Sequence, residues 1–495
     1  MQLRQLGYDA AMTRWMLLGG VLLAAGCTKA NPAAKCSTGT CIDPSYPFCD
    51  VDGSLSGSAG SCISVSCTPG DFKECRGDVA LTCNAMGNNY DELQCQMGCT
   101  PEAKGCKLCQ AGQTVCTNGE VQTCDASGAV TSATPCALGC YQNDPRCRLV
   151  DASNGFGQYG DMVPSPPDVS LGSGSFSLMD GSVIDQQANV FVSIPNFLAP
   201  APSGGVPVRV YVVNSLHVHD ATFNGTGGDI AVAIISAGDI VIDGTVSVLP
   251  GSGSYSAAGC NGADGTYTDR DNESTCAGGG GGANATNGAP GGNVLNGNVG
   301  NLETGGAAGA AAGTANLTPL RGGCGGGYSA TTGMHVVPAA GGGGAIQLTS
   351  GTRISVNGTI DVRGGQGADD YYQTMSNGTG YIVGGGGGGG SMLLEAPAVI
   401  LSATAKLLAT GGDGGQNCTT STSDCGIGGH GATAGVAATR GTDAQNVNSQ
   451  LFAVTAGGGG GGLGRIRINT PDQTYTKTNS SVEDGDLTVG VLATR

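Results

Sequence analysis

This sequence of 495 residues contains few charged residues, few aromatic residues and very few basic residues. Charged residues make up 12% of it and aromatic residues 4%, which is unusual for a globular enzyme. Acidic residues outnumber basic ones by 38 to 21, which gives a formal net charge of −17. Proteins that bind nucleic acid carry a basic surface, so we expect no nucleic-acid partner.

The N-terminal apolar stretch is too short to cross a bilayer. It covers residues 15–25, whereas a spanning helix needs about 20 residues. Arg4 and Arg14 precede this stretch and a cysteine follows it, an arrangement typical of a secretory signal. Cleavage would remove Trp15, the only tryptophan. Without this stacking platform for sugars, the sequence favours binding through backbone amides and acidic or amide side chains, or a structural role.

Residues 22–27, LLAAGC, resemble the bacterial lipobox. In that family the cysteine, here Cys27, carries a diacylglycerol thioether and becomes the mature N-terminus. Ala24 departs from the commonest Leu, and Thr28 stands where a lipoprotein retained in the inner membrane usually carries Asp. The resemblance therefore implies a signal peptide at 1–26, a tether at 27–35 and a lipid anchor in the outer membrane. The chain would be exposed at the cell surface or face the periplasm; an ordinary secretory signal is the alternative.

Cysteine is abundant, with 22 residues, and this implies an oxidising compartment. Four cysteines fall in a module at 36–66, and six fall in each of two repeats at 67–108 and 109–149. Such short modules bury too little apolar surface to be stable alone, so we expect disulfides within each module. Zinc binding is disfavoured because the only Cys-x-x-Cys, Cys106 to Cys109, joins the two repeats.

Cysteine repeats that follow a lipobox and precede a glycine-rich β domain resemble surface lipoproteins of myxobacteria and their relatives. The resemblance implies a location and an architecture. It does not imply an activity.

A repeated pattern in the second half predicts the fold. Residues 345–365 contain three pairs of alternating apolar residues with glycine between the pairs, which indicates three short strands and two corners. The unit recurs at 232–251 and 392–412, and a truncated copy lies at 465–468. About 20 residues per three strands is the length of one coil of a parallel β-solenoid.

We therefore expect a mainly β chain in three parts. The disulfide-rich modules come first, and a Ser/Gly/Pro linker follows at 150–187. Residues 188–495 would form a glycine-rich, right-handed parallel β-helix-like domain of the pectin-lyase type.

The alternation also predicts the direction of side chains. Ile354 should stack between Ile240 and Val399 of the neighbouring coils, whereas alternate residues should face solvent. The inward set is Ile346, Leu348, Ile354, Val356, Ile360 and Val362, and the outward set is Gln347, Ser355 and Asp361.

Three glycine-rich insertions separate the coils, at about 252–344, 367–390 and 413–462. They contain few large apolar residues. Glycine chains can pair through backbone hydrogen bonds without a side-chain core, so we expect extended polyglycine-like segments packed against the solenoid. Disorder is the alternative.

A further resemblance concerns the polygalacturonase-like glycosidases, which use paired Asp residues, Gly-His-Gly and Arg-Ile-Lys. This chain has Asp369-Asp370, His430 between two glycines, and Arg465-Ile-Arg. If the roles transferred, Asp370 would be the general acid, Asp369 would help to activate water, and Arg465 would bind a sugar carboxylate. The Asn-Thr-Asp motif of that family is absent, and Asp370 and His430 are further apart in sequence than that family allows.

Two groups of residues are candidates for metal binding. His217 and His219 share one strand face and could share a metal ion, with a solvated strand face as the alternative. Clustered carboxylates supply the hard oxygen ligands that calcium prefers. We nevertheless expect no cofactor and a disulfide-closed acidic surface loop, with calcium binding as the alternative. The calcium candidates are Asp264, Asp269, Asp271 and Glu273.

The β domain has an odd number of cysteines. Short separations predict disulfides between Cys260 and Cys276 and between Cys418 and Cys425. Cys324 would then be a free or intermolecular thiol.

Two functions of different classes follow from these features. The first is a non-enzymatic, lipid-anchored surface protein, in which a disulfide-rich stalk presents a β-solenoid for adhesion or for contact with the envelope or matrix. Its partners would be the membrane, through the lipid, and a surface polysaccharide or envelope protein. The second is a polysaccharide-degrading β-helix enzyme, a glycosidase or a lyase.

Overall fold

The computed structural model shows a mainly β chain, with 39% of residues in strands and 2% in helices, as the alternating pattern predicts. It describes residues 35–36, 41–102, 104–107, 109–110, 112–136, 138–141, 145–225, 229–252, 254, 259–270, 273–296, 300–329, 340–373, 379–416, 425–446 and 453–495. Cys27 lies outside these ranges. No helix within them has the length and apolar character needed to span a membrane. The chain divides into two compact units, Met1–Val115 with Gln122–Thr134, and Cys116–Val121 with Pro135–Arg495.

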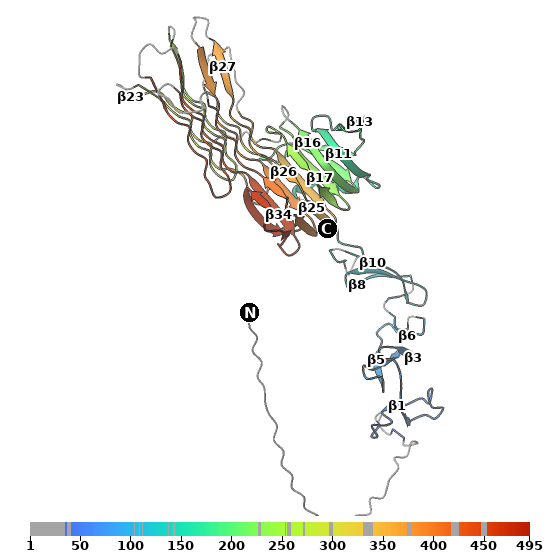
Figure 1. Ribbon diagram of the computed structural model, residues 1–495. Helices are drawn as coiled ribbons and strands as arrows, with labels where there is room; N and C mark the ends of the chain where they lie inside the picture. The colour runs from blue at the N-terminus through green and yellow to red at the C-terminus, as the bar shows by residue number, and fades with distance from the viewer. Residues whose placement is uncertain are drawn as a thin grey trace, which may run out of the picture. The chain divides into compact units, whose positions relative to one another are not determined.

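The cysteine-rich modules consist of short antiparallel strands (Figure 1). The first module contains β1 (Phe48–Asp50) and β2 (Ser61–Ile63). The first repeat contains β3 (Phe72–Arg76), β4 (Val79–Cys83), β5 (Tyr90–Gln94), β6 (Cys99–Thr100) and β7 (Gly105–Cys106). The second repeat contains β8 (Thr114–Thr117), β9 (Glu120–Cys124) and β10 (Val130–Pro135).

All sixteen cysteines of the three modules pair within their own module, which confirms the prediction. Both repeats connect the first cysteine to the third, the second to the fifth and the fourth to the sixth. These cross-links supply the stability that modules of about 40 residues cannot obtain from a hydrophobic core. The bonds are Cys36–Cys49, Cys41–Cys62, Cys67–Cys83, Cys75–Cys99, Cys95–Cys106, Cys109–Cys124, Cys116–Cys140 and Cys136–Cys147.

The second unit contains two large sheets, and the first is seven-stranded. Its order is β14-β15-β17-β24-β29-β34-β37, and all pairs except β14 with β15 are parallel. The strands are β14 (Asn196–Ala199), β15 (Val208–Val213), β17 (Ala231–Ser236), β24 (Ala345–Ser350), β29 (Ser391–Glu395), β34 (Arg465–Thr470) and β37 (Asp486–Val491).

The second sheet is twelve-stranded and consists of two parallel rows that meet at one long strand, β16 (Ser215–Asn224). One row is β18 (Ile240–Ile242), β25 (Arg353–Val356), β30 (Ala398–Leu401) and β35 (Thr476–Lys477). The other row is β19 (Thr245–Val248), β26 (Thr359–Asp361), β31 (Lys406–Leu408) and β36 (Val482–Asp484). On its other side β16 pairs with β11 (Asp168–Ser177), beyond which lie β12 (Val183–Asp185) and β13 (Val190–Phe191).

The predicted register is confirmed in the middle repeats. Ile354 pairs with Ile240 on one side and with Val399 on the other. All six side chains of the predicted inward set are buried in one hydrophobic core between the sheets. Ser355 and Asp361 lie on the outer face and are partly exposed, as expected.

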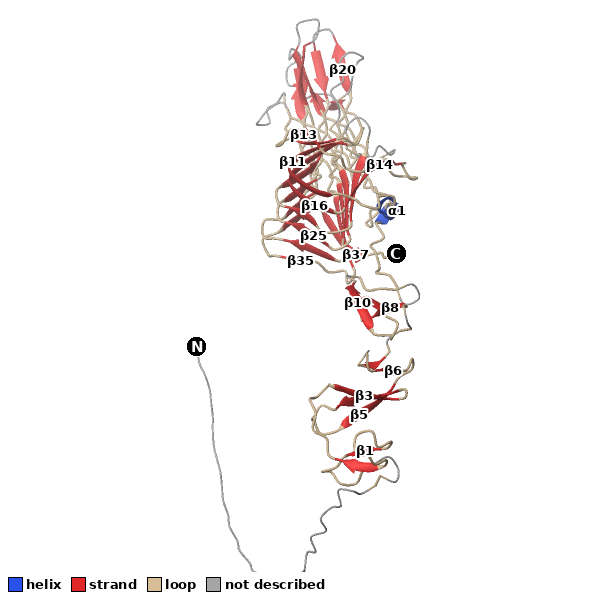
Figure 2. Cartoon of the chain, turned by 90° about the vertical axis from the view of Figure 1, so that its right-hand side faces the viewer, coloured by secondary structure: helices blue, strands red, loops and turns tan. Residues whose placement is uncertain are grey.

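The linker predicted at 150–187 is wrong. This segment contains η1 (Ser153–Gly155), α1 (Gly157–Asp161), β11 and β12, and it is an integral part of the second unit. Figure 2 shows α1 beside the first sheet, on the face turned away from the second sheet. Gln347 was expected to face solvent, but it is fully buried. Its amide contacts Ser153 and Asn154, because the segment predicted to be a linker covers this face of the sheet.

The glycine-rich insertions form a packed array, as predicted, and disorder is excluded for their described residues. Successive residues donate to three different neighbouring segments in turn: Gly385 to Gly327, Gly386 to Gly459 and Gly387 to Gly365. A period of three without internal hydrogen bonds is the geometry of a polyproline II helix. A Cβ atom on Gly386 would lie 2.0 Å from the carbonyl oxygen of Gly412, so the close approach requires glycine.

Short strands continue several of the glycine segments. They form three small sheets. The strands are β20 (Tyr267–Arg270), β21 (Glu273–Cys276), β22 (Val294–Asn296), β23 (Gly300–Glu303), β27 (Asp369–Gln373), β28 (Thr379–Val383), β32 (Ala444–Asn446) and β33 (Ala453–Thr455).

The array also corrects the predicted disulfides of the β domain. Cys260 bonds Cys324, 64 residues away, so the Cys260–Cys276 bond and the free Cys324 thiol are both wrong. The reason is that segments 259–266 and 322–329 run side by side, as the hydrogen bond from the Gly262 amide to the Gly325 carbonyl shows. Cys425 takes part in a disulfide, and Cys418, its predicted partner, lies outside the described residues.

Candidate functional site

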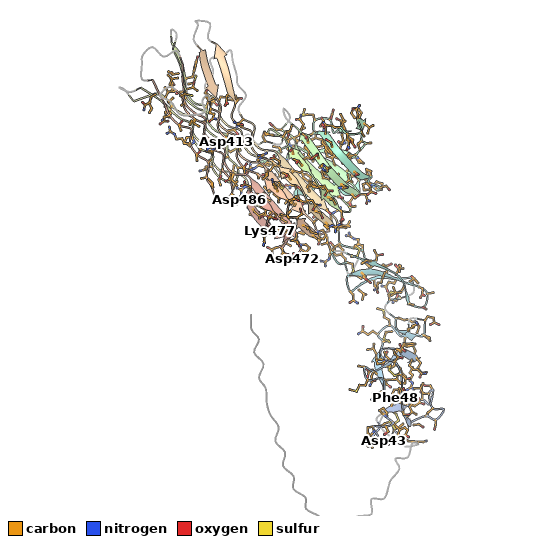
Figure 3. The ribbon with its side chains drawn as sticks, viewed as in Figure 1. Asp43, Phe48, Asp413, Asp472, Lys477 and Asp486 are labelled. Atoms are coloured by element: carbon orange, nitrogen blue, oxygen red, sulfur yellow. A yellow bond between two sulfur atoms is a disulfide. The ribbon has the colours of Figure 1, made fainter. Side chains whose placement is uncertain are left out.

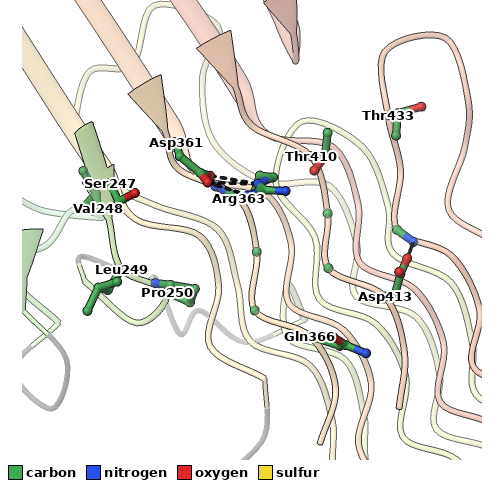
Figure 4. A pocket seen from close by; sticks show the side chains of 15 residues that line it. Ser247, Val248, Leu249, Pro250, Asp361, Arg363, Gln366, Thr410, Asp413 and Thr433 are labelled. Carbon is green, nitrogen blue, oxygen red and sulfur yellow. Dashed lines mark hydrogen bonds and ion pairs between the residues drawn. The ribbon is translucent and has the colours of Figure 1, made fainter. Parts of the chain in front are cut away.

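A groove of about 460 Å³ lies where β19, β26 and β31 end and the glycine segments begin (Figure 4). This volume is within the ~300–1,000 Å³ of typical ligand sites. Glycine backbone forms much of the wall, and none of the described residues that line it is aromatic. Its polar side chains include Asp361, Arg363, Gln366, Thr410, Asp413 and Thr433.

An ion pair fixes one side of the groove. The Arg363 Nε atom lies 3.0 and 3.1 Å from the two carboxylate oxygens of Asp361, and Nη2 lies 2.7 Å from one of them. These hydrogen bonds raise the pKa of Arg363 above its ordinary value. Between them Val362 is fully buried and holds the backbone in the core. The pair therefore presents little net charge to a ligand.

Asp413 is the carboxylate on the other side. Its Oδ1 atom accepts the backbone N–H of Gly431 at 2.8 Å. The His430 Nδ1 atom lies 3.6 Å from the same oxygen. The His430 side chain is 82% exposed and the Asp413 side chain is 56% exposed. Exposed pairs of this kind contribute little energy. This side of the groove consequently carries a partly uncompensated negative charge.

Acidic and amide side chains cap the edges of the glycine array. Asp369 accepts the backbone N–H of Gln416 at 2.8 Å, and Asp264 accepts that of Tyr328 at 2.8 Å. Asn261 accepts that of Gly325 at 3.1 Å. Each cap satisfies an amide that faces outward from the array, where no further glycine segment can receive it.

The capping pattern stops at the groove. On the segment that ends in Asp369, Gln366 and Arg363 stand three and six residues earlier. Asp369 caps Gln416 on the neighbouring segment. At the same sequence separation, Gln366 corresponds to Asp413 and Arg363 corresponds to Thr410. The backbone N–H groups of Asp413 and Thr410 have no acceptor within the described ranges. The groove thus offers two backbone donors that the side chains beside them leave open.

Comparison with known proteins supplies no template for this groove. No family model, curated protein or solved structure matches the chain. Its function has to be inferred from its own residues.

The residues predicted from the glycosidase pattern do not converge. Asp369 accepts the amide of Gln416, at one end of a glycine segment. Arg465 forms an ion pair with Asp486 at 3.0 Å. It follows Gly464, whose amide donates to Ala409 at the other end of that segment. From 409 to 416 the segment runs seven residues, which at ~3.1 Å per residue is about 20 Å. Figure 3 labels Asp413, on that segment, and Asp486, the partner of Arg465.

His430 lies beside Asp413, part-way between Asp369 and Arg465, and the side chain of Asp370 lies outside the described atoms. A glycosidase site made of these four residues is therefore not formed. Asp369 instead acts as a cap of the array.

Most of the predicted calcium site lies outside the described atoms. Asp264 caps Tyr328, Asp271 lies outside the described residues, and so do the side chains of Asp269 and Glu273.

The two histidines turn to different carboxylates: His217 Nε2 lies 2.6 Å from Asp243, and His219 Nδ1 lies 2.9 Å from Asp220. Hydrogen bonds from Asn357 and His217 lower the pKa of Asp243. The structure thus places His217 and His219 in two separate pairs with different carboxylates.

A buried carboxylate, missed in the sequence, anchors the N-terminal segment of the unit. Glu395 is fully buried, and its Oε2 atom accepts from Gln347 at 2.8 Å and from the Ser153 amide at 3.0 Å. Its Oε1 atom accepts from the Ser153 hydroxyl at 2.6 Å and from Asn469 at 3.0 Å. Burial lowers the pKa of the adjacent Arg467, and the charge of Glu395 opposes that shift. The only hint in the sequence is a Glu at the end of an apolar strand, MLLE.

Proposed function

We propose that this chain is a non-enzymatic, lipid-anchored protein of the bacterial outer membrane, similar to surface lipoproteins of myxobacteria. Its cysteine-rich modules form a stalk, and its β unit provides a surface for adhesion or for contact with the envelope or matrix. The observation that carries the proposal is the set of eight disulfides, each confined to one module, directly after a lipobox. Such dense cross-links are typical of an oxidising, extracytoplasmic compartment.

The finer fold that we propose is a right-handed parallel β-solenoid. Three rows of parallel strands, each joined in the same order along the chain, support it. So does the spacing of equivalent strands: Ile354 of β25 pairs with Val399 of β30, one short coil and one glycine insertion later. Solenoids of this kind expose long lateral surfaces, which suit contact with extended partners.

Binding rather than turnover is favoured by the state of the candidate catalytic groups. Asp369 and Arg465 are engaged in separate structural contacts about 20 Å apart along the segment that relates them. The groove contains two carboxylates, and both are already engaged: Asp361 pairs with Arg363, and Asp413 accepts the Gly431 amide. General acid–base hydrolysis of a glycosidic bond requires two such groups across the bond.

Membrane fractionation with intact-mass analysis tests the proposal. The wild-type protein is expected in the outer-membrane fraction, with the mass of a chain that begins at a diacylated Cys27. A Cys27→Ala variant should lose both the lipid mass and the membrane association while keeping its disulfides. A soluble wild-type chain without lipid would refute the proposal.

A further inference from the structure

We propose that the groove binds a glycine-rich segment of a partner protein in the polyproline II conformation. The groove is the one lined by Asp361, Arg363, Gln366, Thr410 and Asp413. The segment would be held by its backbone carbonyls, as a further member of the glycine array. This inference rests on the proposed function, because it names the class of partner that the β unit contacts.

The array itself shows how such a segment is held. The amides of Gly364 and Gly367 donate to the carbonyls of Thr410 and Asp413, at 3.0 and 2.8 Å. These donors stand three residues apart on one segment and the acceptors three residues apart on the next. Three residues of a polyproline II helix advance about 9 Å. Neighbouring segments therefore match automatically, because both repeat at the same spacing.

The groove has backbone donors at the same spacing, but no described segment lies opposite to accept from them. The backbone N–H groups of Thr410 and Asp413 are also three residues apart, and no described residue accepts from them. The carbonyl of Gly411, between them, receives no hydrogen bond from a described residue either. A polyproline II segment presents a carbonyl to one side every third residue, again about 9 Å apart. A β-strand presents them about 7 Å apart, so it fits less well.

The chemistry of the walls indicates a neutral backbone rather than a charged chain. Asp361 and Arg363 neutralise each other, and Asp413 adds negative charge. A polyuronate would be repelled by that carboxylate. Glycine allows the close approach seen elsewhere in the array, where a Cβ atom on Gly412 would lie 1.9 Å from the Gly365 carbonyl oxygen. Proline at intervals would hold the segment in the required conformation before binding.

The test measures, by fluorescence anisotropy, the binding of a labelled peptide of four Pro-Gly-Gly repeats to the full chain in detergent. Gln366→Asn places an amide where it can cap the Asp413 N–H, as Asn261 caps Gly325. Thr410→Pro removes the other donor. Each is expected to weaken binding about threefold to tenfold, the effect of one hydrogen bond, without lowering the unfolding midpoint.

Asp369→Asn is the matched control, because it changes the same segment outside the groove and keeps its cap. It should bind the peptide like the wild type. Hydrogen exchange at residues 410–413 should slow when the peptide binds. A flexible peptide of Gly-Gly-Ser repeats should bind more weakly, because more conformational entropy is lost.

Equal affinity for the wild type, Gln366→Asn and Thr410→Pro would overturn the inference, and so would the absence of peptide binding. If the peptide does not bind, and maltohexaose binds the wild type but binds these two variants more weakly, the groove is assigned to a neutral saccharide and the inference is overturned. These outcomes leave the lipid on Cys27 and the membrane fraction unchanged, so they are distinguishable from failure of the proposed function.

Discussion

Glu395 should be among the most sensitive positions of the β unit. Its carboxylate is fully buried and accepts hydrogen bonds from Ser153, Gln347, Thr349 and Asn469. Glu395→Ala would leave several buried donors without an acceptor, each at about 1–3 kcal/mol. Removing one member of a buried charged network typically costs ~3–5 kcal/mol in total, because the remaining groups relax. We expect a loss of that size.

The assay is the guanidinium midpoint of the full chain, followed by circular dichroism without reductant, together with hydrogen exchange of residues 153–161. Exchange there should rise in Glu395→Ala, because Ser153 is the direct contact of this segment with the carboxylate. Glu395→Gln should lose about 1–3 kcal/mol, since its NH₂ group faces donors. Arg353→Ala, at an exposed pair with Asp239, should cost less than ~1 kcal/mol. Equal midpoints for Glu395→Ala and Arg353→Ala would refute the anchoring role.

Three further predictions concern the coils, the array and pH. Ile354→Ala should lower the free energy of unfolding by ~2–5 kcal/mol, whereas Ser355→Ala should change it by less than ~0.5 kcal/mol, measured by denaturant midpoint. Gly386→Ala should cost about 3 kcal/mol or more, because its Cβ atom would overlap a carbonyl oxygen 2.0 Å away. The Ser182 amide, with nearby hydroxyls, lowers the pKa of Asp180 to about 2. NMR titration should therefore find this turn intact above the unfolded pKa of ~3.9 and its stabilisation lost as the pH falls toward 2.

Each of these predictions has its own contradicting result. A larger loss at Ser355 than at Ile354 would mean that the register is shifted by one residue. Gly325→Ala is the control for the array, because its Cβ atom would lie 3.3 Å from the Ala340 carbonyl; a cost equal to that of Gly386→Ala would refute close packing as the reason for glycine. An ordinary carboxyl pKa at Asp180 would remove the acid-dependent effect.

The parallel strands and their register were predictable because their determinants are local. Alternation around Ile354, with glycine at the corners, sets the strands and the register within one repeat, and neighbouring repeats carry the same pattern. The groups of cysteines were predictable for the same reason, since each module closes within its own sequence.

The errors arose where distant segments meet. Gln347 is buried because Ser153, almost 200 residues earlier, covers it. Cys260 reaches Cys324 because two glycine segments lie side by side, which spacing alone does not reveal. Asp369 resembled a catalytic residue in the sequence, but its role depends on which amide of a neighbouring segment lies opposite.

Protease treatment of intact cells tests the central claim most directly. The account predicts that a tag at the C-terminus is lost from wild-type cells on brief protease treatment, while a periplasmic marker stays intact. It also predicts that Cys27→Ala cells retain no tag on their surface and release the soluble chain, with its disulfides formed, from the membrane. A wild-type chain that is protected from protease and recovered without lipid in the soluble fraction would contradict the account.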